Sequence, residues 1–157
     1  MRVPRIYLET SVFNFVFADD APAAKADTLK LFEEIKAGKY APFMSVHVVE
    51  ELGRAPEPKR SRMFELIDKY GVEILPNNAE TERLADIYIA EGMIPAKYAD
   101  DALHIASTGV WGLDIIVSWN FKHIVKVKTI AQSEIINFKE GYKRVMINSP
   151  TEVIEND

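Results

Sequence analysis

Apolar residues follow two alternating patterns along this chain. Short runs that are apolar almost throughout predict buried strands at 5–11, 42–45, 72–75, 114–118 and 145–147. Between these runs, apolar residues recur every three or four positions, which predicts helices at 22–39, 46–52, 60–70, 80–90, 98–107 and 129–138. Strands that alternate with helices of about ten residues are typical of an α/β fold, with a largely parallel sheet and helices on both faces.

Nothing along the chain marks a second domain. The sequence contains no internal repeat and no linker long enough to separate two units, so we expect one domain over residues 1–157, with its core at about 5–147. An apolar stretch, Val12–Phe17, follows the first predicted strand. Its residues Phe13, Phe15 and Phe17 suit either the core or the surface of a homodimer.

Composition narrows the class of protein. Of the 157 residues, 48% are apolar and 27% are charged, which is the balance of an ordinary globular domain. The chain has no cysteine, which excludes disulfides, thiolate metal sites and cysteine nucleophiles. No segment approaches the roughly 18 consecutive apolar residues of a membrane helix. We therefore expect a cytoplasmic protein that does not bind membranes.

Polar residues stand where predicted strands end or where the next helices begin. These residues are Glu9, Glu50 with Glu51, Asp100 with Asp101, and Ser118 with Asn120. Ligands of open α/β sheets bind at the carboxyl ends of the strands, so these side chains are candidates for one shared site. Each also has a simpler interpretation. Glu9 suits a helix cap or a partner for an arginine, and acidic residues are favoured in a first helical turn without any function.

The types of polar residue limit the chemistry of such a site. The three histidines, His47, His104 and His123, lack the spacing of a zinc site. Carboxylate and amide oxygens suit Mg²⁺ or Mn²⁺ instead. The sequence contains neither of the glycine-rich phosphate-binding motifs and no GxSxG nucleophile motif.

Four ordered motifs resemble the PIN-domain family, which includes the VapC-like toxin ribonucleases. They are the segments YLETS at 7–11, SVHVVEEL at 45–52, DALHIA at 101–106 and IIVSWN at 115–120. The resemblance implies a Rossmann-like three-layer α/β/α fold and an acidic site that binds Mg²⁺ or Mn²⁺. It also implies hydrolysis of RNA phosphodiester bonds, commonly by the toxin of a toxin–antitoxin pair, with an antitoxin protein as partner.

The resemblance assigns roles to individual residues. Glu9, Glu51, Asp101 and Asn120 match the positions of the family's metal ligands, although Glu9 and Asn120 stand where aspartate is common. Thr10, Ser11 and Ser118 are expected to orient these ligands from behind. Two other functions stay open: a PIN module that binds RNA or protein without cutting, which the departures at Glu9 and Asn120 favour, and a metallo-phosphatase for small phosphate esters.

Charge is unevenly distributed along the chain. The net charge of −5 counts against a protein that holds nucleic acid mainly by electrostatic attraction. Basic residues nevertheless gather in two segments, and the candidate RNA contacts among them are Arg54, Lys59, Arg60, Lys122 and Lys126. Taken alone, each cluster is explained more simply as a solvated helix face. A nuclease that collects carboxylates around a divalent cation is compatible with a negative total.

Overall fold

A computed structural model describes residues 2–155 of the chain. Five short strands form one sheet, in the order β3-β2-β1-β4-β5, and every neighbouring pair is parallel. The strands are β1 (Arg5–Leu8), β2 (Ala41–Ser45), β3 (Glu73–Leu75), β4 (Ile115–Val117) and β5 (Met146–Asn148). The predicted α/β fold with a parallel sheet is therefore confirmed.

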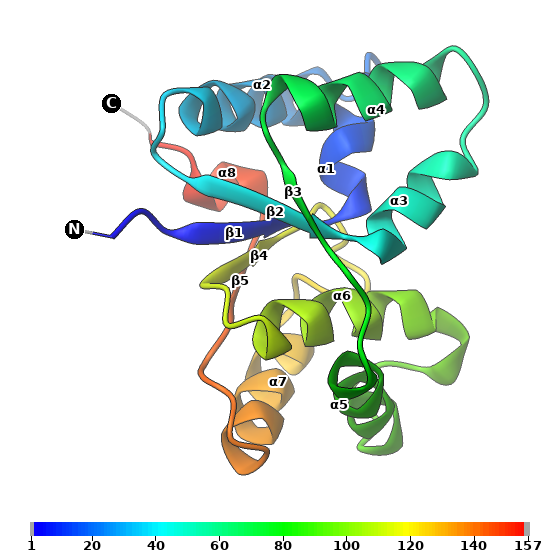
Figure 1. Cartoon of the computed structure of the whole chain (residues 1–157), viewed down its shortest axis with the longest axis vertical. Helices are drawn as coiled ribbons and strands as arrows, with labels where there is room; N and C mark the ends of the chain where they lie inside the picture. The colour runs from blue at the N-terminus through cyan, green and yellow to red at the C-terminus, as the bar shows by residue number, and fades with distance from the viewer. Residues whose placement is uncertain (1, 156–157) are drawn as a thin grey trace.

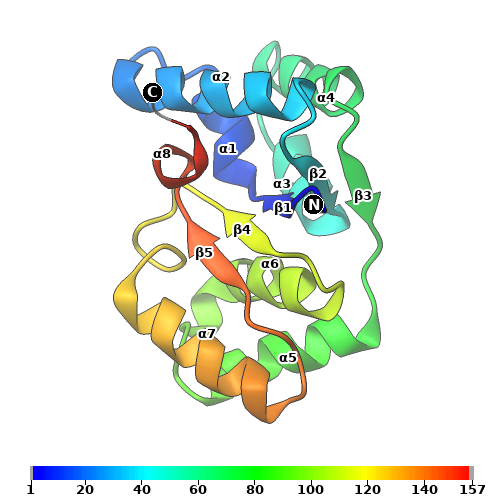
Figure 2. The same ribbon diagram turned by 90° about the vertical axis from the view of Figure 1, so that its left-hand side faces the viewer.

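Helices cover both faces of this sheet (Figures 1 and 2). One layer contains α1 (Thr10–Phe15), α2 (Pro22–Lys36), α4 (Lys59–Lys69) and α8 (Pro150–Val153). The other contains α5 (Ala79–Ala90), α6 (Ala99–Val110) and α7 (Val127–Lys139), with the short 3₁₀ helix η1 (Ala96–Tyr98) before α6. Helix α3 (Val46–Gly53) continues directly from β2 and contacts both α4 and α6. Among residues 2–155, no helix has the length and apolar character needed to cross a membrane.

The two central strands are buried on both faces. Ile6, Tyr7 and Leu8 of β1 have no exposed surface, and neither have Ile116 and Val117 of β4. Tyr7 lies opposite Phe43 of β2 on one side and Ile116 of β4 on the other. Continuous apolar runs are what a parallel strand between two helical layers requires, because neither of its faces meets water.

The first strand is shorter than predicted. It ends at Leu8, and Glu9 caps a short helix, α1, by accepting a hydrogen bond from the backbone N–H of Ser11. Carboxylates are good caps because they satisfy free N–H groups in the first helical turn. Within α1, Phe13 is fully buried and belongs to the core. Phe13 is therefore not available to a homodimer surface, and the homodimer stays a prediction.

The strand order places one special point on the sheet. From β1 the chain moves outward through β2 to β3, and it then returns to place β4 on the opposite side of β1. Where the direction of winding reverses, the connections leave the carboxyl ends of two neighbouring strands on opposite sides, and a crevice opens between them. Glu9 follows β1 and Ser118 follows β4, so both lie at this point.

Candidate active site

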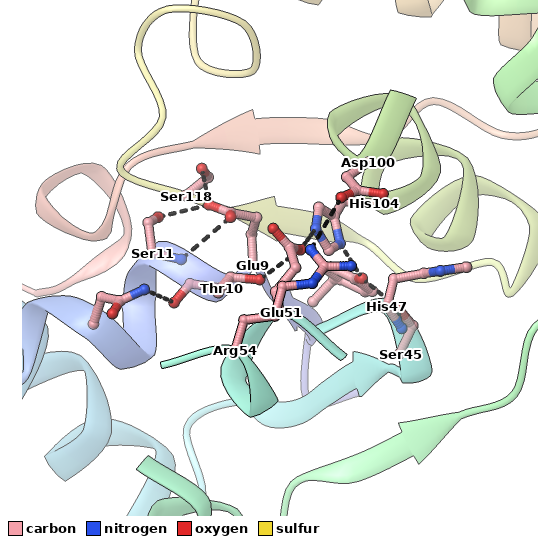
Figure 3. Close-up of polar contacts among 12 residues, drawn as sticks. Glu9, Thr10, Ser11, Ser45, His47, Glu51, Arg54, Asp100, His104 and Ser118 are labelled. Carbon is pink, nitrogen blue, oxygen red and sulfur yellow. Dashed lines mark hydrogen bonds and ion pairs between the residues drawn. The ribbon is translucent and has the colours of Figure 1, made fainter. Parts of the chain in front are cut away.

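Glu9 is held by hydroxyl groups rather than by a cation. Its side chain is 5% exposed. Its Oε1 accepts hydrogen bonds of 2.6 Å from the hydroxyls of Ser11 and Ser118, and its Oε2 accepts one of 3.2 Å from the Ser11 amide (Figure 3). These bonds connect the end of β1 to the end of β4. They fix the carboxylate without neutralising it.

Glu51 has a different environment. It lies on α3, and its Oε1 accepts a 2.8 Å hydrogen bond from the Thr10 hydroxyl and also contacts Nε2 of His104 (Figure 3). His104 is fully buried on α6, and its Nδ1 lies 2.7 Å from the hydroxyl of Tyr7. That hydroxyl lies 2.7 Å from Oγ of Ser45. A continuous polar chain therefore runs from Ser45 to Thr10 through the core.

The contact between Glu51 and His104 favours the charged form of both side chains. Burial alone would raise the pKa of the Glu51 carboxyl, but the hydrogen bond and charge of His104 lower it below its usual value. Burial alone would likewise lower the pKa of His104, but the hydrogen bond and charge of Glu51 raise it. This half of the site carries its own counter-charge.

The surroundings of Asp101 disfavour its charged form, in contrast to those of Glu51. It lies in the first turn of α6, where burial and the negative charges of Glu9 and Glu51 raise its pKa to about 6. The charge of His104 and a hydrogen bond with Asn120 oppose this rise without cancelling it. The Oδ1 of Asn120 also accepts a 2.9 Å hydrogen bond from the backbone N–H of His123. Asp101 thus lies within the electrostatic range of two other carboxylates.

The structure brings the predicted site residues to one place. They lie in four separate segments of the chain: Glu9 after β1, Glu51 on α3, Asp101 on α6 and Asn120 after β4. The charges of Glu9 and Glu51 and a hydrogen bond with Asn120 all act on Asp101. Thr10 donates to Glu51, and Ser11 and Ser118 donate to Glu9. Of the two glutamates in α3, Glu50 is exposed, as expected for a residue that faces solvent.

Sequence reasoning missed the buried part of the polar chain. Tyr7 and Ser45 are not among the candidates that the sequence offers, and the sequence does not show that His104 pairs with Glu51. One sequence signal could have found Tyr7: its hydroxyl interrupts an otherwise apolar strand, and a buried hydroxyl needs a partner. Trp119 packs on Phe15 with the ring centres 5.3 Å apart, and its Nε1 donates to the Thr28 hydroxyl, which is a structural role.

Among the candidate RNA contacts, Arg54 acts on a carboxylate of the site. Its charge helps to lower the pKa of Glu51, and its Nη1 lies 3.7 Å from Oδ2 of Asp100. Lys122 lies over the ring of Tyr98, immediately before α6, with its Nζ 5.4 Å from the ring centre. The remaining candidates are Lys59 and Arg60, at the start of α4, and Lys126, which precedes α7.

The donor atoms of the site suit a divalent cation, but the side chains are not arranged to bind one. Three carboxylates and one amide oxygen are the ligands that Mg²⁺ and Mn²⁺ prefer, and their mutual repulsion favours a cation among them. Between residues 2 and 155, however, no three His, Asp or Glu side chains form a group ready to hold a metal ion. Glu9 and Glu51 point their oxygens at hydroxyls and at His104 instead.

Comparisons with known proteins concern the fold. No family model matches the sequence, and no curated protein matches it. Among solved structures, the crystal structure of VapBC2 from Rickettsia felis bound to a DNA fragment from their promoter contains a chain of similar fold. The TM-score is 0.53 at 15% identity, and the match covers 92% of this chain and 98% of that one. Together with the all-parallel five-stranded sheet, it confirms the predicted three-layer α/β/α fold.

Proposed function

We propose that this protein is an endoribonuclease that depends on Mg²⁺ or Mn²⁺. The observation that carries the proposal is the convergence of Glu9, Glu51 and Asp101 at the point where the winding of the sheet reverses. Such a concentration of like charge in a partly buried place opposes folding, so its presence favours a functional role. The fold shared with a chain of VapBC2 agrees with the resemblance of the sequence motifs to the VapC-like toxins, and it extends the proposal to a protein partner that acts as antitoxin.

Each site residue has a part in this proposal. Glu9, Asp101 and the amide oxygen of Asn120 would hold the cation, and Glu51 would join them from its position on His104. When bound, the cation lowers the pKa of a water molecule and stabilises negative charge on the phosphate. Ser11 and Ser118 keep Glu9 in one orientation. Arg54, close to Glu51, would hold a phosphate of the RNA backbone beside the reacting one.

The test compares two neighbouring aspartates. Asp101→Asn removes a charge from the site, whereas Asp100→Asn removes one from the same helical turn at a side chain that is 52% exposed and points to Arg54. With labelled RNA and Mn²⁺, we expect Asp101→Asn to cut about 100-fold to 1,000-fold more slowly and Asp100→Asn to stay within about threefold of wild type. EDTA should stop the wild type. Equal cleavage by Asp101→Asn would refute the proposal.

A second function has one observation in its favour. Because the described side chains form no ready group of three metal ligands, a PIN-like module that binds RNA or protein without cutting remains a candidate. The same experiment separates the two functions. RNA that is bound but left intact by the wild type with Mn²⁺ would support the binding module. Turnover of a small phosphate ester with RNA left intact would support a phosphatase.

A further inference from the structure

A basic pocket lies on the opposite end of α1 from the carboxylates. It has a volume of about 340 Å³ and is lined by Phe17, Asp19, Lys25, Pro58, Lys59 and Arg62. Its walls come from the turn after α1, from α2 and from the start of α4. We call it the α4 pocket.

The α4 pocket concentrates positive charge on an acidic protein. Three cations and one carboxylate line it, which leaves a net charge of +2, whereas the whole chain carries −5. Lys25 neutralises Asp19, with its Nζ 2.5 Å from Oδ1. Lys59 and Arg62 form no ion pair with any residue between 2 and 155. Their charges are therefore available to an anion from outside.

Phe17 adds a second kind of contact. It is half-buried, packs against the hydrophobic core and lines the same pocket as the cations. A fixed aromatic ring offers a surface on which a base can stack, and stacking with nearby positive charge is the usual combination in proteins that bind single-stranded nucleic acid. Arginine and lysine supply the phosphate contacts of such sites. The pocket therefore suits a nucleotide better than it suits a bare anion.

The position of the pocket connects it to the candidate active site. Helix α1 begins beside Glu9 and, at 1.5 Å per residue, its six residues span about 9 Å before the turn that contains Phe17 (Figure 1). Arg54 lies beside Glu51 (Figure 3). It precedes Lys59 by five residues along the chain. Positive side chains are thus present both at the carboxylates and at the pocket.

We propose that the α4 pocket binds a nucleotide of a single-stranded RNA substrate, a short distance along the strand from the phosphodiester bond that is cut. This inference rests on the proposed function. The three carboxylates repel an RNA backbone, and Arg54 is one cation that acts on Glu51, so further attraction to the substrate is expected from cations outside the site. An acidic protein segment would satisfy Lys59 and Arg62 but would gain little from Phe17.

Binding can be measured without cleavage in the Asp101→Asn background, by the fluorescence anisotropy of a labelled single-stranded RNA in EDTA. In that background, Lys59→Gln with Arg62→Gln should raise the Kd for RNA about tenfold and reduce its dependence on salt concentration. The matched control, Lys36→Gln with Lys69→Gln, removes the same charge from the ends of α2 and α4 away from the pocket. It should change the Kd less than about twofold.

The aromatic contact has its own variant. Phe17→Leu keeps an apolar side chain against the core but removes the stacking surface, so it should raise the Kd for RNA by about fivefold or more. It should leave the Kd for inorganic polyphosphate unchanged, because that polyanion has no base. An equal loss for both ligands would contradict the role of Phe17.

The outcomes separate this inference from the proposed function. If the wild type cuts RNA while the pocket variants bind and cut it equally well, the pocket inference is wrong and the nuclease stands. If the wild type never cuts but the pocket variants weaken RNA binding, the pocket stands and the nuclease is wrong. If the pocket variants weaken the binding of a polyglutamate peptide and leave the binding of RNA unchanged, the pocket is a protein-binding site and the inference is overturned.

Discussion

Two aspartates at opposite ends of β4 have opposite environments. At the amino end, Asp114 accepts hydrogen bonds of 2.7 Å from Arg2, 2.8 Å from the Arg5 amide and 2.7 Å from Lys143. Burial alone would raise the pKa of Asp114, but these donors lower it to about 2. At the carboxyl end, burial and the charges of Glu9 and Glu51 raise the pKa of Asp101 to about 6.

The difference distinguishes a structural carboxylate from a functional one. Asp114 gains from ionisation in the folded state, so it ties the N-terminal segment to the strand that starts at Ile115. Asp101 loses from ionisation in the folded state, because it is partly buried and its neighbours are carboxylates. A residue that lowers the stability of the fold in this way is expected to have a function, such as binding a cation or a substrate. The predictions below test this contrast.

The largest effect should come from His104. Replacing it with leucine leaves Glu51 without its counter-charge and leaves the buried hydroxyl of Tyr7 without one partner. Breaking a buried ion pair costs about 3 kcal/mol or more, so the urea midpoint at pH 7.5 should fall sharply. The double variant His104→Leu with Glu51→Leu should recover much of this loss, because no unpaired charge remains. If His104→Leu lowers the free energy of unfolding by less than about 1 kcal/mol, the contact between Glu51 and His104 does not stabilise the buried charge of the site.

The next effect is a gain in stability. Asp101→Asn removes the carboxylate that Glu9 and Glu51 repel, so in EDTA it should raise the free energy of unfolding by about 2 kcal/mol. Millimolar Mn²⁺ should stabilise the wild type and shrink this gain, because only the wild type keeps the full set of ligands. Asp100→Asn is the control and should change stability by only about 0.5 kcal/mol, through the helix dipole. A destabilised Asp101→Asn protein would reverse the interpretation of Asp101.

Stability should depend on pH with opposite signs at the two aspartates. The folded pKa of Asp101 lies above the value of about 4 in an unfolded chain, so its contribution is full below pH 4 and is lost as pH rises to about 6. The folded pKa of Asp114 lies below that value, so its contribution is full above pH 4 and is lost as pH falls to about 2. Urea midpoints in EDTA between pH 2 and pH 8 measure both parts of the curve of stability against pH: a lower limb from pH 2 to pH 4 and an upper limb from pH 4 to pH 6. Asp101→Asn should flatten the upper limb, by up to about 2 kcal/mol, and leave the lower one unchanged.

The layout of the fold could be predicted because its signal is local. The apolar run at 114–118 predicts a strand that is buried on both faces, and β4 lies at 115–117. For the short helix α1 the sequence indicates a cap at its start but not its bounds, since Val12–Phe17 is apolar except for Asn14 and shows no helical periodicity. Glu9 shows the limit most clearly. Its place at the end of a strand and its suitability as a helix cap are visible in the sequence, and the cap is a local contact with Ser11. Its bond to Ser118 depends on how β1 and β4 are aligned, so the sequence does not show it.

The sequence predicts where along the chain the site residues stand, but it does not predict which side chains they contact. The spacing of the motifs identifies Glu51 and Asp101 as neighbours of strand ends, yet it does not show which of them His104 faces. That choice depends on how α3 and α6 pack across 53 residues of sequence. Tyr7 was missed for the same reason, because its partners Ser45 and His104 lie 38 and 97 residues away.

The smallest effect should come from Asp114→Asn. Arg2 and Lys143 are 60% and 42% exposed, so water screens their attraction and each pair contributes little. The hydrogen bond from the Arg5 amide is better protected, and the asparagine oxygen can still accept it. We therefore expect a loss of about 1 kcal/mol at pH 7, measured from the urea midpoint, and a flatter acid limb between pH 4 and pH 2. RNA cleavage should not change, because Asp114 lies at the amino end of β4. A drop in cleavage without a drop in stability would mean that the two ends of the sheet are coupled and that the contrast between Asp114 and Asp101 is not one of location.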